Sequence, residues 1–128
     1  MGARRRVFAK EGRMQVVEND FQGVPVLRVV GELDHANAPL LRASVDGAFA
    51  KGGTCILFDL ASCPYVDSGG VSVLLDTLRR VKPEGWLGTV GATPDVLRIL
   101  SLVGFTVDSS FRTFPTFAEA QTALEGLR

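Results

Sequence analysis

One stretch, Thr54 to Val81, constrains the fold of this chain more than any other. Cys55 to Leu60 is a short apolar run with β-branched and aromatic residues, as in a central strand covered on both faces. Apolar residues then recur at steps of three and four and form one face of a helix: Val71, Leu74, Leu75, Leu78 and Val81. The stretch therefore predicts a buried strand, a polar turn and a helix.

The residues before this stretch predict a hairpin and a helix. Arg13 to Asn19 alternates moderately, Asp20 to Gly23 is rich in turn residues, and Val24 to Val30 is almost continuously apolar. Asn37 then has the chemistry of a helix N-cap, with Pro39 in the first turn. This helix runs to about Ala50 and ends at a pair of glycines.

The residues after Val81 again predict a strand followed by a helix. Trp86 to Gly91 predicts a strand, and Thr93 begins a helix that ends at Gly104 and turns four residues inward: Val96, Ile99, Leu100 and Val103. The last strand is either Phe105 to Val107 or Arg112 to Phe114, and a final helix starts near Thr116.

The predicted order is β-β-α-β-α-β-α-β-α, an α/β fold with about four helices and a mixed sheet of four to five strands. The first two strands pair antiparallel, and strands separated by helices pair parallel through right-handed crossovers. The loops after Gly31, Leu60 and Gly91 then lie at one edge of the sheet, where open α/β folds bind their ligands.

Length and charge restrict the class of protein. A chain of 128 residues predicts a single domain, and 14 basic against 14 acidic residues argue against nucleic-acid binding. Arg4, Arg5, Arg6 and Lys10 predict a flexible basic tail over residues 1–12, leaving 13–128 as the folded domain. No apolar run is long enough to span a membrane and no secretion signal is recognisable, so we expect a cytoplasmic protein.

The sequence also argues against metal, cofactor and catalytic sites. Cys55, Cys63 and the single histidine, His35, supply no four-ligand zinc set, and no phosphate-binding glycine motif occurs. Val66 stands two residues before Ser68, where the nucleophile elbow of a hydrolase has glycine. We therefore predict neither a cofactor nor an enzyme.

Ser68, in the turn Asp67-Ser68-Gly69-Gly70, has two interpretations. Its hydroxyl can cap the following helix by accepting a backbone N–H bond, or it can be a phosphorylation site, since a helix N-terminus tolerates an anion. The predicted topology places Asp34 on the neighbouring loop. Glu32, Asp34, His35 and Asp67 can thus form a recognition patch or be ordinary solvated loop residues.

Four segments resemble the STAS-domain anti-sigma-factor antagonists of sporulation and stress responses. They are Gly-Glu-Leu-Asp-His at 31–35, Leu-Phe-Asp-Leu at 57–60, Tyr-Val-Asp-Ser-Gly-Gly-Val at 65–71, and Pro-Asp-Val-Leu-Arg-Ile-Leu at 94–100 followed by Gly104-Phe105. The likeness covers about Gln15 to Leu124. It implies a STAS fold and a protein that binds an anti-sigma serine kinase and thereby releases a sigma factor.

The resemblance also assigns roles to residues. It implies that the kinase phosphorylates Ser68, that the phosphorylated protein lets the kinase go, and that a serine phosphatase resets it. The partner-binding residues that it implies are Glu32, Asp34, His35, Asp67, Ser68, Gly69 and Gly70. It names neither the kinase nor the oligomeric state.

Gly69 departs from the family pattern. The turn of these antagonists usually reads Asp-Ser-Ser-Gly, so Gly69 replaces the second serine. Asp-Ser-Gly-Gly is also similar to the Asp-Thr-Gly-Gly turn of STAS subunits in phospholipid-trafficking ABC transporters. A regulatory subunit bound to a transporter ATPase is therefore the alternative function.

Overall fold

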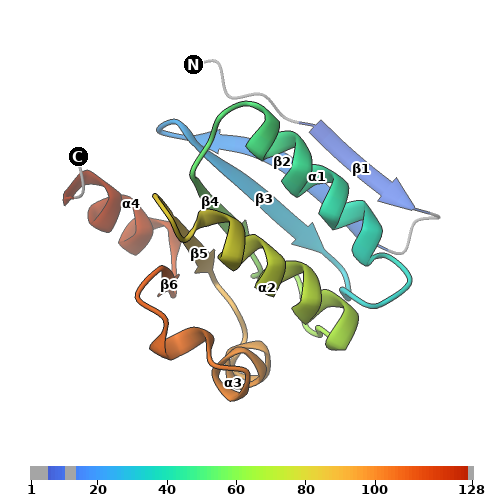
Figure 1. Cartoon of the computed structure of the whole chain (residues 1–128). Coiled ribbons are helices and arrows are strands. Elements are labelled where there is room, and N and C mark those ends of the chain that lie inside the picture. Colours follow the sequence, from blue (N-terminus) through green and yellow to red (C-terminus); the bar gives the residue numbers. More distant parts are fainter. Residues whose placement is uncertain (1–5, 11–13, 127–128) are drawn as a thin grey trace.

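The computed structural model describes residues 6–10 and 14–126. Its strands are β1 (Arg6–Lys10), β2 (Met14–Phe21), β3 (Val24–Val30), β4 (Cys55–Asp59), β5 (Trp86–Val90) and β6 (Phe111–Phe114). Its helices are α1 (Ala38–Ala50), α2 (Ser68–Val81), α3 (Pro94–Leu102) and α4 (Phe117–Gly126), with a 3₁₀ helix η1 (Phe105–Val107). Figure 1 shows their arrangement.

The strands form one mixed sheet in the order β1-β2-β3-β4-β5-β6. The pairs β1–β2 and β2–β3 are antiparallel, and the pairs from β3 to β6 are parallel. Gln22 and Gly23 close the β2–β3 hairpin with positive φ angles of 53° and 88°, which matches the right-handed twist of the strands. The predicted α/β class, the mixed sheet and the four helices are confirmed.

The first strand corrects the sequence prediction. Residues 1–12 are predicted as a flexible tail, but residues 6–10 form β1, with Arg6 opposite Glu18 and Lys10 opposite Met14. The outer edge of β2 has backbone N–H and C=O groups that need partners, and β1 supplies them. The sheet therefore has six strands instead of four to five. Residues 1–5 and 11–12 lie outside the described residues.

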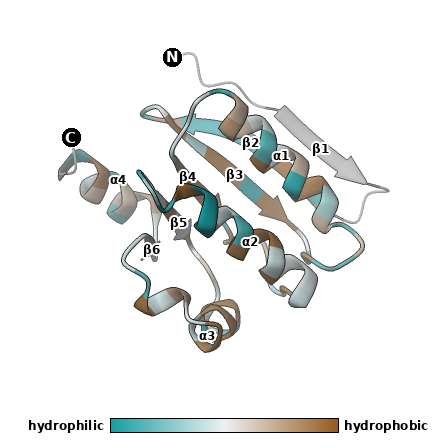
Figure 2. Ribbon diagram, in the orientation of Figure 1, coloured by the Kyte–Doolittle hydropathy of each residue, from teal (hydrophilic) through white to brown (hydrophobic). Residues whose placement is uncertain are grey.

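Helices cover both faces of the sheet. In Figure 1, α1 and α2 lie side by side across one face, where they enclose the main core with Leu27, Ile56, Phe58 and Leu87 from the strands. On the other face, Ala120 and Leu124 of α4 pack in a smaller cluster with Val26, Leu57 and Val90. Figure 2 accordingly shows β3 as largely hydrophobic, while α1 and α2 alternate in character along their length.

Ion pairs between α1 and α2 hold the two helices in register. Arg42 lies 2.7 Å from Asp76, and Arg80 lies 2.6 Å from Asp46. The Arg80 guanidinium also stacks on the ring of Phe49, at 4.3 Å from its centre. All four charged side chains are exposed, so the pairs orient the helices more than they stabilise the fold.

Around α3, one prediction is wrong and one open alternative is decided. Thr93 caps α3 by accepting the Val96 N–H, as predicted, but Val103 is 47% exposed because the helix ends at Leu102 and the chain turns at Gly104 (φ 94°). Phe105–Val107 forms η1 and not a strand, so Phe111–Phe114 is the last strand. Phe105 packs edge-on against Phe111 and thereby fixes η1 to the sheet.

Candidate functional site

Two loops extend the pairing of β3 and β4 beyond the sheet. These are the β3–α1 loop (residues 31–37) and the β4–α2 loop (residues 60–67). Leu33 and Val66 form a parallel bridge: the Leu33 N–H donates to the Tyr65 carbonyl (2.9 Å), and the Asp67 N–H donates to the Leu33 carbonyl (3.1 Å). Leu33 and Val66 are both buried. The loops at this edge are therefore tied together by backbone bonds, as the predicted topology requires.

Asp67, and not Ser68, caps α2. Its Oδ1 accepts the N–H groups of Gly69 (2.8 Å) and Gly70 (3.1 Å), and its backbone is extended, as an N-cap requires. Ser68 is the first residue of the helix. The prediction that the Ser68 hydroxyl is the cap is wrong, because the preceding carboxylate already takes the N–H groups that the hydroxyl would accept.

The Ser68 side chain consequently takes no part in the cap of α2. The residue is exposed, and no hydrogen bond to its hydroxyl occurs among the residues that the structure describes. It stands at the end of the sheet where the two tied loops meet. A partner or modifying enzyme can reach it without any rearrangement of the fold.

His35 lies directly against the start of α2. Its backbone N–H donates to Asp67 Oδ2 at 3.0 Å, so the one carboxylate binds both loops. A Cβ atom on Gly69 would lie 2.6 Å from the Cα of His35, which is closer than real Cβ atoms approach. Only glycine therefore allows this contact, and the departure from the family turn at Gly69 has a steric reason in this chain.

Gly70 has a comparable role one residue further on. It is buried, and a Cβ atom there would lie 2.7 Å from Leu33 Cγ and 2.8 Å from Val66 Cγ1. The missing side chain lets α2 start directly over the bridge between the two loops. The structure thus brings His35, Asp67, Ser68, Gly69 and Gly70 together, as the sequence predicts.

Asn37 organises the remaining predicted site residues. It makes no side-chain cap for α1, contrary to the prediction. Its Oδ1 instead accepts the Asp34 N–H (2.9 Å), its Nδ2 donates to the Glu32 carbonyl (2.9 Å), and its own N–H donates to Asp34 Oδ1 (3.0 Å). The Asn37 side chain is buried, so it works as an internal clamp for the loop.

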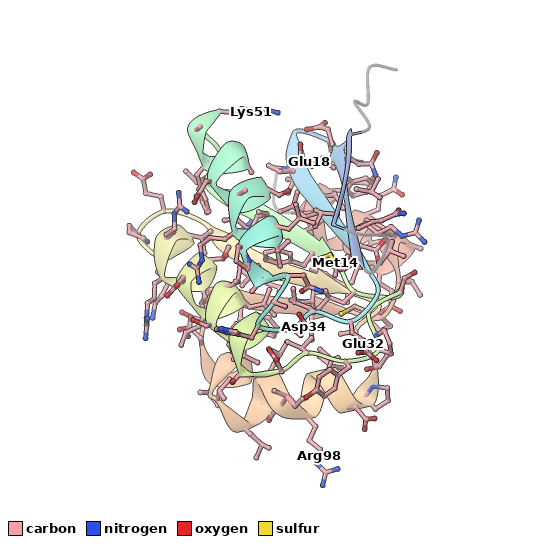
Figure 3. All side chains as sticks on the ribbon, turned by 90° about the vertical axis from the view of Figure 1, so that its right-hand side faces the viewer. Met14, Glu18, Glu32, Asp34, Lys51 and Arg98 are labelled. Atoms are coloured by element: carbon pink, nitrogen blue, oxygen red, sulfur yellow. The ribbon has the colours of Figure 1, made fainter. Side chains whose placement is uncertain are left out.

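The clamp presents Glu32 and Asp34 at the surface. Glu32 is exposed and Asp34 is half-buried. Figure 3 shows both side chains at the loop end of the molecule, far from Lys51 at the other end of α1. These acidic groups and Asp67 share one edge with Ser68, so that edge carries negative charge next to the serine.

Tyr65 is an exposed aromatic residue at the same edge that the sequence did not single out. It is 49% exposed, one residue before the Leu33–Val66 bridge. Its carbonyl accepts both the Leu33 N–H and the thiol of Cys63 (3.4 Å). Burial raises the pKa of the Cys63 thiol, so it remains a protonated donor at neutral pH. Two hydrogen bonds to the Tyr65 carbonyl therefore fix the backbone that carries the exposed Tyr65 ring.

The pKa of Asp67 lies below the ordinary range of an aspartate. Burial raises it, but the N–H groups of Gly70, His35 and Gly69 favour the carboxylate and lower it by more. The unfolded pKa is about 3.9. The stability that ionised Asp67 contributes is therefore complete above that pH and is lost as the pH falls through the lower native value.

The lowered pKa of Asp67 predicts how the stability of the protein depends on pH. Between pH 5 and pH 2, we expect the unfolding temperature of the wild-type protein to fall more steeply than that of an Asp67→Asn variant, because the variant lacks this titration. Differential scanning calorimetry across the pH series measures both slopes. Other carboxylates, such as Asp108 paired with Lys82, titrate in both proteins and cancel in the comparison. Parallel curves would contradict the assignment.

The described part of the chain offers two negative findings. Within residues 6–10 and 14–126, no group of three or more histidine, cysteine, aspartate or glutamate side chains is placed to hold a metal ion. Among the helices of these residues, none has the length and apolar character needed to cross a bilayer.

Comparison with known proteins identifies the domain. The model of the STAS domain family matches residues 15–120. The anti-sigma-F factor antagonist RsfB of Mycobacterium tuberculosis is 29% identical over 109 residues, which cover 85% of this chain and 88% of that protein. The anti-sigma F factor antagonist of Paenibacillus polymyxa is 26% identical over 117 residues, or 89% of this chain and 95% of the relative.

A solved structure agrees with both sequence relatives. The crystal structure of an anti-sigma factor antagonist from Mycobacterium paratuberculosis superimposes with a TM-score of 0.77 at 27% identity, covering 92% of this chain and 99% of that one. The family model spans both tied loops, the cap of α2 and the sheet from β2 to β6. From these matches and the fold, this chain belongs to the STAS domain family.

Proposed function

We propose that this protein is an anti-sigma factor antagonist whose binding is switched off by phosphorylation of Ser68. One observation carries the proposal: Ser68 is exposed with a free hydroxyl at the point where the two tied loops meet α2. The names of the relatives support the antagonist role. The partner would be an anti-sigma serine kinase in the cytoplasm, where transcription takes place, and a serine phosphatase would reset the protein.

The proposed docking edge consists of Glu32, Asp34, His35, Asp67, Ser68, Gly69 and Gly70. Its backbone is fixed before binding by the Leu33–Val66 bridge and the Asn37 clamp. A preorganised surface loses little conformational freedom when a partner docks, which favours affinity. In this proposal the chain acts by binding and is a substrate of its partner, without catalysing a reaction itself.

Phosphorylation would change the charge of this edge and leave the fold intact. Transfer of the γ-phosphoryl group of ATP forms the bond from Ser68 Oγ to phosphorus, breaks the bond to the β–γ bridging oxygen, and releases ADP and a proton. The product carries about −1.5 to −2 charges at pH 7. It stands beside Asp67, at the edge that also carries Glu32 and Asp34, so a partner that docks there must remove the added charge from water at a desolvation cost.

The test uses the cognate anti-sigma kinase, identified by pull-down with this protein, and labelled ATP. We expect label on the wild-type protein and on a Ser109→Ala variant, which removes another exposed serine, and none on Ser68→Ala. A Ser68→Glu variant should bind the kinase at least about tenfold more weakly, since a charge that a docked partner removes from water costs several kcal/mol. Its circular dichroism spectrum should match that of the wild type. Label retained on Ser68→Ala would refute the proposed site.

The alternative function is a STAS subunit bound to the ATPase of a phospholipid-trafficking ABC transporter. The turn Asp67-Ser68-Gly69-Gly70 is the feature that favours it. Stable co-purification with such an ATPase, together with absence of label on Ser68 in the kinase assay, would decide for this alternative.

A further inference from the structure

The carboxylate of Asp67 makes hydrogen bonds in two directions. Oδ1 accepts two N–H groups from the first turn of α2, and Oδ2 accepts one N–H group, that of His35 in the β3–α1 loop. A single side chain therefore links the residue next to Ser68 with the loop that carries Asp34 and His35. The link to His35 is exposed to solvent, and the cap is half-buried.

We infer that Asp67 transmits phosphorylation of Ser68 to the β3–α1 loop. The phosphate repels the adjacent carboxylate, the hydrogen bond from the His35 N–H weakens, and the loop that presents Asp34 and His35 loosens. This inference rests on the proposed function, since it concerns the consequence of phosphorylation at the same serine. Asp67 is then a positioning residue of the docking edge, and not itself the site of modification.

The hydrogen bonds that Oδ1 and Oδ2 of Asp67 accept differ in strength, and this difference decides which of them breaks. Two N–H groups and the positive end of the α2 dipole hold Oδ1, whereas one exposed N–H group holds Oδ2. A repelled carboxylate therefore keeps its cap and releases His35.

The nearest titratable cation is His35 itself. A charged imidazole would attract the phosphate and oppose the release. Histidine side chains as a class change their charge between about pH 5 and pH 8, so the positive charge that would oppose the release is least at the upper end of that range. The β3–α1 loop also carries Glu32 and Asp34, whose carboxylates are negative like the phosphate. The experiment is therefore done at pH 8.

The matched variant is Asp67→Asn. Its one amide oxygen can accept the N–H groups of Gly69 and Gly70, but the amide NH₂ then faces the His35 N–H, and two donors cannot bond. The variant retains the cap and loses the link, and it also loses the charge that responds to the phosphate. Asp95→Asn is the control, because Asp95 is an exposed aspartate in the first turn of α3 at the same sheet edge.

The readout is the rate of solvent exchange of the His35 amide, measured by NMR. We expect phosphorylation, Ser68→Glu and Asp67→Asn each to raise that rate about tenfold, the factor that corresponds to about 1.4 kcal/mol. Phosphorylation or Ser68→Glu on the Asp67→Asn background should add nothing, because the two changes act through one bond. Asp95→Asn should leave the rate unchanged.

An unchanged His35 rate in both the phosphorylated protein and Ser68→Glu overturns the inference, as do additive effects in the double variant. Neither Ser68→Glu nor Asp67→Asn requires a kinase for this measurement. If Ser68 is not labelled by the kinase but Ser68→Glu still loosens His35, the proposed function fails and the coupling through Asp67 stands. If Ser68 is labelled and the exchange rate of the His35 amide does not change, the proposed function stands and the coupling through Asp67 fails.

Discussion

Replacing Phe58 by alanine should lower the free energy of unfolding by about 3–5 kcal/mol, the usual cost of truncating a buried phenylalanine. Phe58 lies in the central strand β4, opposite Leu27 of β3 and Thr89 of β5, and no part of it is exposed. The main core between the sheet and α2 would be left with a cavity in its middle. Total stabilities of domains are only about 5–15 kcal/mol, so much of the margin would be lost.

Urea unfolding followed by circular dichroism measures this loss. Phe58→Leu is the control: it retains most of the apolar volume and should cost clearly less than the alanine variant. Because β4 leads directly to the β4–α2 loop, we expect partner binding to weaken in proportion to the unfolded fraction and not beyond it. A loss below about 1 kcal/mol for Phe58→Ala would contradict the position of Phe58 in the core.

Gly85→Ala should be about as damaging for a steric reason. A Cβ atom on Gly85 would lie 1.6 Å from the carbonyl oxygen of Thr54 and 2.5 Å from its carbonyl carbon. Both are backbone atoms, so no side chain can rotate away, and the connection before β5 must separate from the one before β4. We expect a loss of about 3 kcal/mol or more in the free energy of unfolding, the upper range for overpacking.

Gly47→Ala is the matched control for this variant. Gly47 lies within α1, is exposed and has nothing within 4 Å of an added Cβ atom. Alanine is favoured over glycine in a helix by about 1 kcal/mol, so here the same substitution should stabilise the protein. Thermal unfolding of the two variants side by side should shift in opposite directions. A shift of the same sign in both would refute the steric explanation for Gly85.

The elements and their order could be predicted because the apolar period changes clearly along the chain. The run from Cys55 to Leu60 and the helical spacing after Val71 allow few other structures. The prediction failed where periodicity carries no information. Val103 continues the spacing of α3, but the backbone turns at Gly104 and leaves Val103 exposed. Spacing predicts a face only as far as the helix extends.

The site could be predicted to the level of its loops. Parallel topology alone predicts that the loop with Asp34 and His35 lies near Ser68, and the bond from the His35 N–H to Asp67 shows that this loop does reach the start of α2. Which side chain bonds which backbone group depends on distances of a few tenths of an ångström. Sequence patterns do not contain these distances, so the choice between Asp67 and Ser68 as the cap was out of reach.

Asn37 shows a second limit. Asparagine before a helix is a common cap, and here the same amide is turned back into its own loop to hold Glu32 and Asp34. The spacing Asp34-x-x-Asn37 was the available signal, because both side chains readily bond backbone groups nearby in sequence. The local sequence shows that Asn37 can make such hydrogen bonds, and the tertiary fold decides which backbone groups it bonds.

The strand β1 has a practical consequence for anyone shortening this protein. Its residues look dispensable in the sequence, yet they cover the outer side of the eight-residue strand β2. A shortened version beginning at residue 13 would turn β2 into a long open edge, the kind of surface on which molecules join strand to strand and aggregate. Residues 6–10 therefore protect the edge of β2 from pairing with other molecules. The opposite edge of the sheet is the short strand β6.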